Sequence, residues 1–210
     1  MPHTLALSFD DGPNPDATPS VLELLGRHGV TATFFVWGEQ AQRHPELVRE
    51  VLDRGHSVQP HCWAHVSHWT LTPAGIRADI DAVSALLEQI GAPAATLWRP
   101  PYGHTLAGAT PAIAAERGLE LAGWTIDPQD YAGNDAQTMY AEVTGALAAE
   151  ERSVLLLHDG HRKSTQPLRR ADATNTVELV AMLLQDDALA FATLSAGVEA
   201  RLTDGPPPGA

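Results

Sequence analysis

Short apolar runs alternate with longer helical stretches along nearly the whole chain, and this alternation restricts the possible fold more than any other feature. Strands are predicted at residues 4–8, 32–36, 56–59, 96–99, 119–124, 154–157 and 190–193. Helices are predicted between them at residues 19–28, 45–54, 73–90, 111–117, 136–149 and 175–184. Strands joined by helical crossovers form a parallel sheet. About seven such units in 210 residues favour an α/β barrel, complete or incomplete, over an open sheet.

The chain reads as one domain. Proline just inside the start and glycine just past the end mark four of the predicted helices, at Pro19 and Gly29, Pro45 and Gly55, Pro73 and Gly91, and Pro111 and Gly118. No internal repeat or linker interrupts the pattern, so we expect a single domain over residues 1–200. The remaining residues, 201–210, are rich in proline and glycine and are predicted to form a disordered tail.

Composition excludes several classes of partner. Thirteen basic residues against 26 acidic ones give a formal charge of −13, which argues against binding nucleic acid or an anionic membrane. Cys62 is the only cysteine, so no disulfide can form within the chain. Neither a signal peptide nor an apolar membrane span is evident, so we expect a cytoplasmic protein, although a secreted chain trimmed of its signal would look the same. We also expect a monomer.

Polar side chains capable of chemistry follow the ends of five different predicted strands. They are Asp10 and Asp11, His61 and His65, Arg99, Asp127 and Asp130, and His158. In parallel α/β barrels the carboxyl ends of the strands form the rim that carries the active site. Residues far apart in the sequence are therefore expected to converge at one rim.

One carboxylate and two imidazoles can hold a divalent transition metal and leave positions open for water and substrate. His61 and His65 are four residues apart, which would place both rings on one face of a helical turn. Asp10 and Asp11 are adjacent, so their side chains point to opposite sides and one can bind metal while the other acts as a base. His68 would share the helical face, so a site of three histidines without Asp11 is an alternative.

Three further segments have both a structural and a functional interpretation. Residues 99–103 form a proline-locked loop in which Arg99 could hold a carboxylate and backbone N–H groups could bind an oxyanion. Residues 124–131 could be a capping turn, or could supply a carboxylate that orients a catalytic histidine and aromatics that line a groove. His158 ends a buried strand and is a candidate proton donor, with His161 nearby as a possible substrate contact.

In chain order these motifs resemble the polysaccharide deacetylase family, which has the NodB homology domain and forms carbohydrate esterase family 4. The matching blocks are Ser8-Phe9-Asp10-Asp11-Gly12-Pro13, His61-x-x-x-His65, Arg99-Pro100-Pro101-Tyr102-Gly103, Asp127-x-x-Asp130-Tyr131 and Leu156-x-His158. Any one block is weak evidence, but five in order over nearly the whole chain are strong. The resemblance implies a deformed (β/α)7 barrel.

The resemblance also implies a metal centre and a base. Asp11, His61 and His65 would bind one divalent metal ion, usually zinc and sometimes cobalt or nickel. Asp10 would be the general base, and Arg99 would brace it.

A general acid and an acetyl pocket follow from the same resemblance. His158 would be the general acid, tuned by Asp130. The backbone N–H of Tyr102 would stabilise the oxyanion, while Leu156 and Tyr131 would shape the acetyl pocket and the substrate groove.

The sequence departs from the family pattern around the expected substrate. Cys62 replaces the usual Ser or Thr after the first histidine, and Gln59-Pro60 replaces the common Gly-Asn before it. His68 and Trp69 stand where Leu and Thr are usual, so we expect both to contact substrate. Tyr131 replaces the usual Trp. These changes leave a polymer and a small molecule both open as substrates.

The function predicted from these features is hydrolytic removal of an acetyl group from an N-acetylated amino sugar or related carbohydrate. Alternatives within the hydrolases are an O-acetyl esterase of the acetylxylan type and a deacetylase of a small acetylated metabolite. Two histidines and a carboxylate would also suit a non-heme iron oxygenase, but the α/β alternation argues against that class. A non-catalytic carbohydrate-binding protein on the same fold is a remote alternative.

Overall fold

The computed structural model describes residues 3–147, 152–160, 170–194 and 202–205. The strands are β1 (His3–Asp10), β2 (Thr33–Trp37), β3 (Ser57–Cys62), β4 (Leu97–Trp98), β5 (His104–Leu106), β6 (Glu120–Leu121), β7 (Arg152–His158), β8 (Leu189–Phe191) and β9 (Thr203–Gly205). The α-helices are α1 (Thr18–His28), α2 (Gly38–Arg43), α3 (Pro45–Asp53), α4 (Pro73–Ile90), α5 (Ala109–Glu116), α6 (Ala136–Leu147) and α7 (Arg170–Leu184). Three 3₁₀ turns are η1 (His68–Thr70), η2 (Pro101–Gly103) and η3 (Asp130–Ala132). Over the described ranges, no helix combines the length and apolar character needed to cross a membrane.

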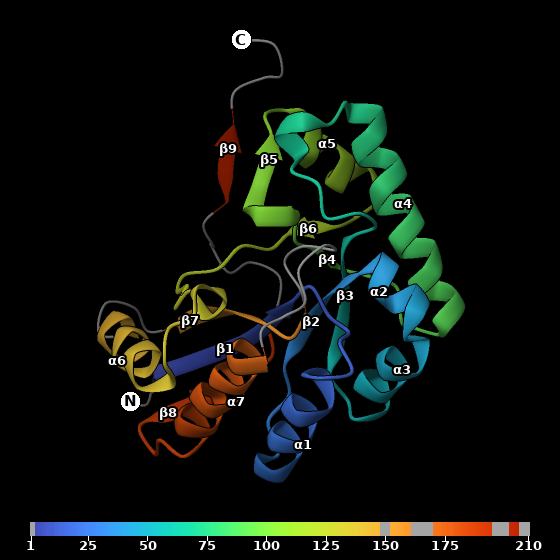
Figure 1. Ribbon diagram of the computed structural model, residues 1–210. Coiled ribbons are helices and arrows are strands. Elements are labelled where there is room, and N and C mark those ends of the chain that lie inside the picture. Colours follow the sequence, from blue (N-terminus) through green and yellow to red (C-terminus); the bar gives the residue numbers. More distant parts are fainter. Residues whose placement is uncertain (1–2, 148–151, 161–169, 195–201, 206–210) are drawn as a thin grey trace.

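Strands β3, β2, β1, β7, β6 and β4 are linked in turn into a ring, while β5 and β9 form a separate pair (Figure 1). Strands β3, β2, β1 and β7 are hydrogen-bonded in that order and are all parallel, while β8 pairs with the start of β1. The side-chain carbonyl of Gln59 in β3 accepts hydrogen bonds from the backbone N–H groups of Thr96 and Leu97, which joins β3 to β4. Strand β4 pairs with β6, and Ile126 beyond β6 bridges Leu155 of β7. These contacts confirm the predicted α/β fold and return the ring to β7 as a deformed barrel.

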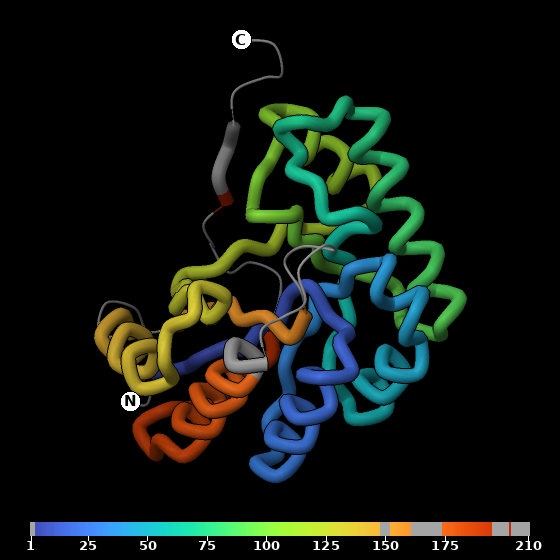
Figure 2. The backbone as a smooth tube through the Cα atoms, viewed as in Figure 1, coloured from blue at the N-terminus to red at the C-terminus, as the bar shows by residue number. Residues whose placement is uncertain are grey.

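Two apolar layers hold this ring together. Side chains alternate along a strand, so Leu5 and Phe9 of β1 join the large cluster shared with the surrounding helices, while Ala6 belongs to the smaller cluster inside the ring. Figure 2 shows the chain passing from the inner strands to the outer helices and back. Ser8 and Asp10 continue the inner face of β1 toward the carboxyl end of the barrel, and both are buried. A polar residue at this inner position is therefore delivered to the rim.

Several local predictions are wrong. His61 lies within β3, and the residues from 63 to 67 after it are not helical, so His61 and His65 do not share a helical turn. The structure also contains α2 and β5, which are too short to give a recognisable hydrophobic period. Helix α6 is described to Leu147, and the predicted residues 148–149 lie outside the described part of the chain.

The predicted tail contains a strand. Residues 203–205 form β9, which pairs in parallel with β5 from His104 opposite Thr203 to Leu106 opposite Gly205. For these three residues the expectation of disorder is wrong, because they bond to the edge of β5, a strand that pairs with no other described strand. Residues 201 and 206–210 lie outside the described residues.

Candidate metal and catalytic site

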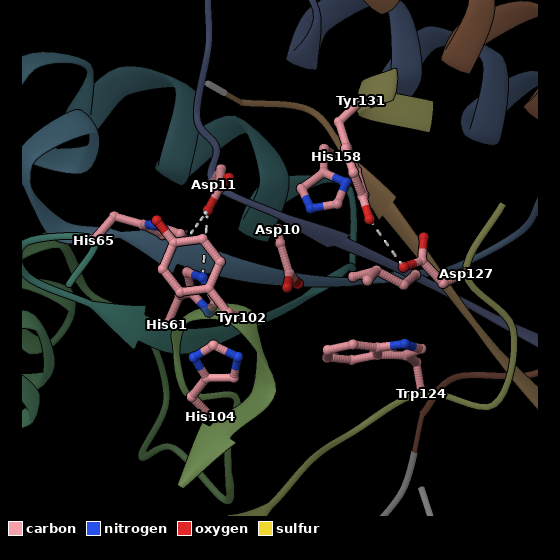
Figure 3. A pocket seen from close by; sticks show the side chains of 11 residues that line it. Asp10, Asp11, His61, His65, Tyr102, His104, Trp124, Asp127, Tyr131 and His158 are labelled. Atoms are coloured by element: carbon pink, nitrogen blue, oxygen red, sulfur yellow. Dashed lines mark hydrogen bonds and ion pairs between the residues drawn. The ribbon is translucent and has the colours of Figure 1, made fainter. Parts of the chain in front are cut away.

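The strands of the ring bring polar side chains to one rim. Asp10 is the last residue of β1, His61 is the last but one of β3, Arg99 follows β4, and His158 ends β7. Asp10, His61 and His158 line a pocket of about 300 Å³, which lies at the lower end of the range for small-molecule sites. The pocket is lined by Asp10, Asp11, His61, His65, Tyr102, His104, Trp124, Asp127, Tyr131, Leu156 and His158 (Figure 3).

One carboxylate and two imidazoles converge at one side of this pocket. Oδ1 of Asp11 lies 3.3 Å from Nε2 of His61 and 3.1 Å from Nε2 of His65. All three side chains are buried, and neither oxygen of Asp11 nor Nε2 of His61 makes a hydrogen bond to any described residue. Buried polar atoms without partners are costly. A divalent cation would satisfy them, and this donor set suits zinc and neighbouring transition metals.

His61 is held in the orientation that a metal ligand requires. Its Nδ1–H donates to the backbone carbonyl of Arg99 at 2.7 Å, which leaves the lone pair on Nε2. The indole N–H of Trp98 also donates to the backbone carbonyl of His61 at 3.0 Å. The ring and the backbone of this histidine are therefore both fixed.

The charges at this group depend on one another. Burial alone would favour the neutral form of Asp11, but the close approach of the His65 and His61 imidazoles holds its pKa well below the usual range. Burial disfavours protonation of His61, but the nearby Asp10 and Asp11 carboxylates raise its pKa. Without a cation, the Asp11 and Asp10 carboxylates thus favour the protonated form of His61.

Left-handed backbone occurs beside the pocket. Among the described non-glycine residues, φ is positive at Asp11 (71°), Tyr102 (61°) and Gln129 (53°). Such a conformation costs about 1–3 kcal/mol and persists only where the surroundings enforce it. Around Asp11 the enforcing contact is close packing, because a methyl group on Gly160 would overlap the backbone carbonyl of Asp11. The loop after β7 therefore fixes the loop after β1.

Asp10 is paired with a buried arginine. An Nη1–H of Arg99 donates to Oδ1 of Asp10 at 2.8 Å and to Oγ of Ser8 at 2.9 Å. The other donors of the guanidinium reach the backbone carbonyls of Ala122 and Gly123, and Arg99 is fully buried. This network holds the Asp10 carboxylate at the pocket wall while leaving its second oxygen outside the bond to Arg99.

A second carboxylate holds His158. Oδ1 of Asp130 accepts the Nδ1–H of His158 at 2.8 Å, and Oδ2 accepts the His158 backbone N–H at 2.8 Å and the hydroxyl of Thr176 at 2.9 Å. Burial of the imidazole lowers its pKa, but the charge and hydrogen bond of Asp130 outweigh this and raise the pKa of His158 to about 9. His158 is therefore protonated at neutral pH and presents its Nε2 side to the pocket, with Asp10 lying between it and the histidine pair (Figure 3).

Three further residues that were predicted from the sequence to lie near the substrate are found in the pocket. Tyr102, Tyr131 and Leu156 all line the pocket. The ring of Tyr131 meets His158 edge to face at 5.2 Å between centroids, and its hydroxyl donates to Asp127 at 3.2 Å. Tyr131 thus contacts both the imidazole of His158 and the carboxylate of Asp127.

His68 and Trp69 do not line the pocket, which corrects the expectation that both contact substrate. His68 is buried against Trp98, and its Nδ1 lies 3.1 Å from the hydroxyl of Thr110. Burial lowers the pKa of His68 to about 4, so it is neutral. The structure also removes the alternative of a three-histidine site, because β3 and the loop after it carry His68 away from His61.

His104 lines the pocket although the sequence assigned it no role, and Trp124, one of the aromatics of residues 124–131 proposed to line a groove, lines it as well. His104 stacks face to face on Trp69 at 3.6 Å, and its Nδ1 lies 2.9 Å from the hydroxyl of Ser67. Trp69 therefore supports a pocket residue instead of forming the wall itself. The one available signal was position, since His104 follows the Tyr102 loop at the same rim. His161 lies outside the described residues.

The chain is similar to known proteins in sequence and in fold. The sequence profile of the polysaccharide deacetylase family matches residues 1–122. The peptidoglycan-N-acetylglucosamine deacetylase PgdA of Listeria monocytogenes is 34% identical over 165 residues, which are 78% of this chain and 34% of that protein. This chain thus spans about a third of that relative's length. A chitooligosaccharide deacetylase of Bradyrhizobium is 35% identical over 156 residues, 74% of this chain and 70% of that protein.

A solved structure extends the likeness to almost the whole fold. The family 4 carbohydrate esterase from Streptomyces lividans, determined in complex with acetate, matches with a TM-score of 0.78 and 27% identity. The match covers 96% of this chain and 97% of that one. Together with the profile match, these likenesses show that this chain belongs to the polysaccharide deacetylase family.

Proposed function

We propose that this protein hydrolyses the acetamido group of an N-acetylated amino sugar, releasing acetate and a free amine. One observation carries the proposal. A carboxylate braced by a buried arginine and a protonated imidazole braced by a second carboxylate share one pocket with a metal-binding group. Amide hydrolysis needs both proton acceptance and proton donation, and the pocket supplies a group suited to each. The named relatives that deacetylate peptidoglycan N-acetylglucosamine and chitooligosaccharides support the sugar amide as substrate.

Asp11, His61 and His65 would hold one divalent ion, and their oxygen and nitrogen donors suit zinc, with cobalt or nickel as alternatives. When bound, such an ion polarises a carbonyl and lowers the pKa of water toward about 7. Asp10 then acts as the general base, accepting a proton as the water oxygen attacks the acetamido carbonyl carbon. Arg99 orients Asp10 through its hydrogen bond to Oδ1.

His158 completes the reaction. As the tetrahedral carbon collapses, the imidazolium donates its Nε2 proton to the amide nitrogen, the C–N bond breaks, and the electron pair of that bond stays on the nitrogen. Asp130 stabilises the charged ring before this transfer and fixes its direction. The backbone N–H of Tyr102, in the left-handed turn that lines the pocket, is the proposed hydrogen-bond donor to the carbonyl oxygen as it gains charge.

We further propose that His104 contacts the sugar. Its ring is held on one face by Trp69 and through Nδ1 by Ser67, and burial lowers its pKa, so it presents a neutral, rigid surface to the pocket. Rigid rings lose little entropy on binding. The pocket volume of about 300 Å³ suits recognition of a single acetylated unit at the reaction centre, whether that unit is free or part of a longer saccharide.

Acetate release tests the function. Zinc- and cobalt-loaded protein would be assayed on N-acetylglucosamine oligomers, peptidoglycan fragments, acetylxylan and small N-acetylated metabolites, with the free amine measured beside acetate. Equimolar acetate and amine from a saccharide support the proposal. Release from acetylxylan alone would identify an O-acetyl esterase, and release from small metabolites alone would identify a metabolite deacetylase. No release from any substrate would favour a binding protein.

The acid role of His158 has its own test. His158→Ala should slow hydrolysis of a sugar acetamide far more than that of an aryl acetate, because a phenoxide leaves without protonation and an amine does not. Equal losses on the two substrates would contradict the role of His158 as proton donor.

A further inference from the structure

We propose that Asp79 of α4 is a positioning residue for the metal centre, because its carboxylate fixes the turn that carries His65. The inference rests on the metal site proposed above. It concerns a residue outside the pocket, contributed by a helix that lines no part of it.

The two histidines differ in how they are supported. His61 is fixed by a hydrogen bond from its second ring nitrogen to Arg99 and by a bond from Trp98 to its backbone. The second ring nitrogen of His65, Nδ1, is buried and has no hydrogen-bond partner among the described residues. Ligand histidines usually gain their orientation from such a partner. His65 must therefore be positioned by its ring contacts and by its backbone.

The ring contacts of His65 do not by themselves fix the position of its Nε2 atom. His65 meets Trp37 at 5.4 Å and Tyr102 at 4.5 Å between centroids, and neither contact sets the distance from Nε2 to Asp11. Aromatic contacts tolerate sliding and tilting, whereas metal ligands must lie within about 0.2 Å of the ideal bond length. The backbone of residues 63–65 is consequently the part of the structure that determines where Nε2 lies.

Asp79 holds that backbone with both of its oxygens. Oδ2 accepts the backbone N–H of Trp63 at 2.8 Å, and Oδ1 accepts the backbone N–H of Ala64 at 3.0 Å. In addition, the backbone N–H of Glu39 in α2 donates to the carbonyl of Trp63 at 3.3 Å. The turn between the two histidines is thus tied to two helices, and the bonds from Asp79 are of the stronger, charge-assisted kind.

Helix α4 is a rigid support for this contact. It spans 18 residues, and Ile76, Ile80 and Val83 on its inner face are fully buried in the main core. Asp79 lies between these anchors in the sequence, so the core fixes the helix backbone that carries its carboxylate. The core thereby sets the position of His65 through one side chain.

The test compares zinc affinity in two isosteric variants of the full chain. Asp79→Asn keeps the shape of the side chain but replaces one acceptor oxygen with an NH₂ group that cannot accept a hydrogen bond. Asp81→Asn on the same helix is the matched control, because Asp81 pairs with Arg117 at the surface. By competition with a chromophoric chelator, Asp79→Asn should weaken zinc binding about 10- to 100-fold, the range for partners of metal ligands, while Asp81→Asn stays within about twofold.

A double-mutant cycle separates positioning from a general loss of charge or stability. If Asp79 acts through His65, Asp79→Asn should have little further effect on zinc affinity in a His65→Ala background. An equal fold-loss in both backgrounds would overturn the inference. Asp79→Glu keeps the charge but displaces the acceptor oxygens, so it should also weaken zinc binding, and unchanged affinity would overturn the inference.

The outcomes also separate this inference from the proposed function. A wild-type protein that binds no zinc would refute the metal site and the inference together. A wild-type protein that binds zinc, with an Asp79→Asn variant of equal affinity, would refute only the role of Asp79.

Discussion

Replacing Asp130 by asparagine should move the alkaline limit of activity to lower pH. Asp130 accepts the Nδ1–H of His158 and supplies the negative charge that offsets burial of the imidazole. The amide of asparagine can still accept that hydrogen bond, but it carries no charge. Only the charges of Asp11 and Asp10 would then oppose burial, which favours the neutral ring.

The magnitude follows from the pKa of His158. Raising that pKa from 6.5 to about 9 corresponds to roughly 3 kcal/mol in favour of the protonated ring. If the variant falls to the ordinary value, the protonated fraction at pH 8 drops from about nine-tenths to about 3%, or roughly thirtyfold. A cation on Asp11 would weaken one of the attractions that raise this pKa, so the loaded enzyme should have a pKa below 9, with the same direction of change in the variant.

The assay is a pH profile of kcat for a sugar acetamide from pH 5 to 10 on metal-loaded protein. The alkaline limb of Asp130→Asn should lie at lower pH than that of the wild type, with the two rates closest near pH 5. The matched control is Asp135→Asn, because Asp135 is an exposed carboxylate nearby that caps Thr138, a role asparagine fills equally well. An unchanged limb in Asp130→Asn, or the same shift in the control, would refute the assignment.

The contact between His158 and Asp130 should also make the stability of the fold depend on pH. A group whose folded pKa is raised contributes stability that is complete below its unfolded value and lost as pH rises through its folded value. The contribution of His158 should therefore be complete below about pH 6.5 and lost toward about pH 9 in the metal-free protein. Urea unfolding at several pH values should show this loss in the wild type and little of it in Asp130→Asn.

Three further predictions concern other residues. Asp10→Asn should lower kcat by about 10²- to 10⁴-fold with zinc still bound, and loss of zinc or near-normal turnover would contradict its role as base. His104→Ala should raise KM for a sugar acetamide several-fold and leave hydrolysis of a small aryl acetate unchanged; an equal effect on both would argue against a sugar contact. Burial raises the pKa of Asp159 to about 7, so ionisation should destabilise the metal-free fold as pH rises from about 4 to 7. Asp159→Asn should flatten that part of the stability profile in urea unfolding, and an unchanged slope would show that another group causes it.

The sequence predicts those parts of the fold whose hydrophobic patterns are long enough to recognise. Strands β1 and β7 are almost completely buried, so they read as apolar runs that end at their polar residues. Strands β4 and β6 have two residues each, and their neighbours are fixed by tertiary contacts such as those of Gln59. Strand β9 forms by pairing with β5, and no local sequence pattern indicates this pairing.

Some features of the candidate site could likewise be predicted from the sequence, and others could not. The chemistry of Asp11, His61 and His65 could be proposed from residue types that follow strands, because parallel strands deliver their ends to one rim. The helical turn inferred from the spacing of the two histidines was wrong, since the same spacing arises from a strand end and an irregular loop. His68 and Trp69 were misplaced because the route of that loop is decided by Thr110, Ser67 and His104. Asp79 of α4 bonds to the backbone of residues 63 and 64, and the local sequence of neither segment indicates this contact.

The central claim is that Asp11, His61 and His65 together hold one divalent ion on which deacetylation depends. Zinc titration of the metal-free protein, with acetate release followed in the same samples, tests it most directly. We expect one zinc per chain, acetate release that rises in proportion to bound zinc, and loss of both in Asp11→Asn. Acetate release that is complete without metal, or stoichiometric zinc binding that persists in Asp11→Asn, would contradict it.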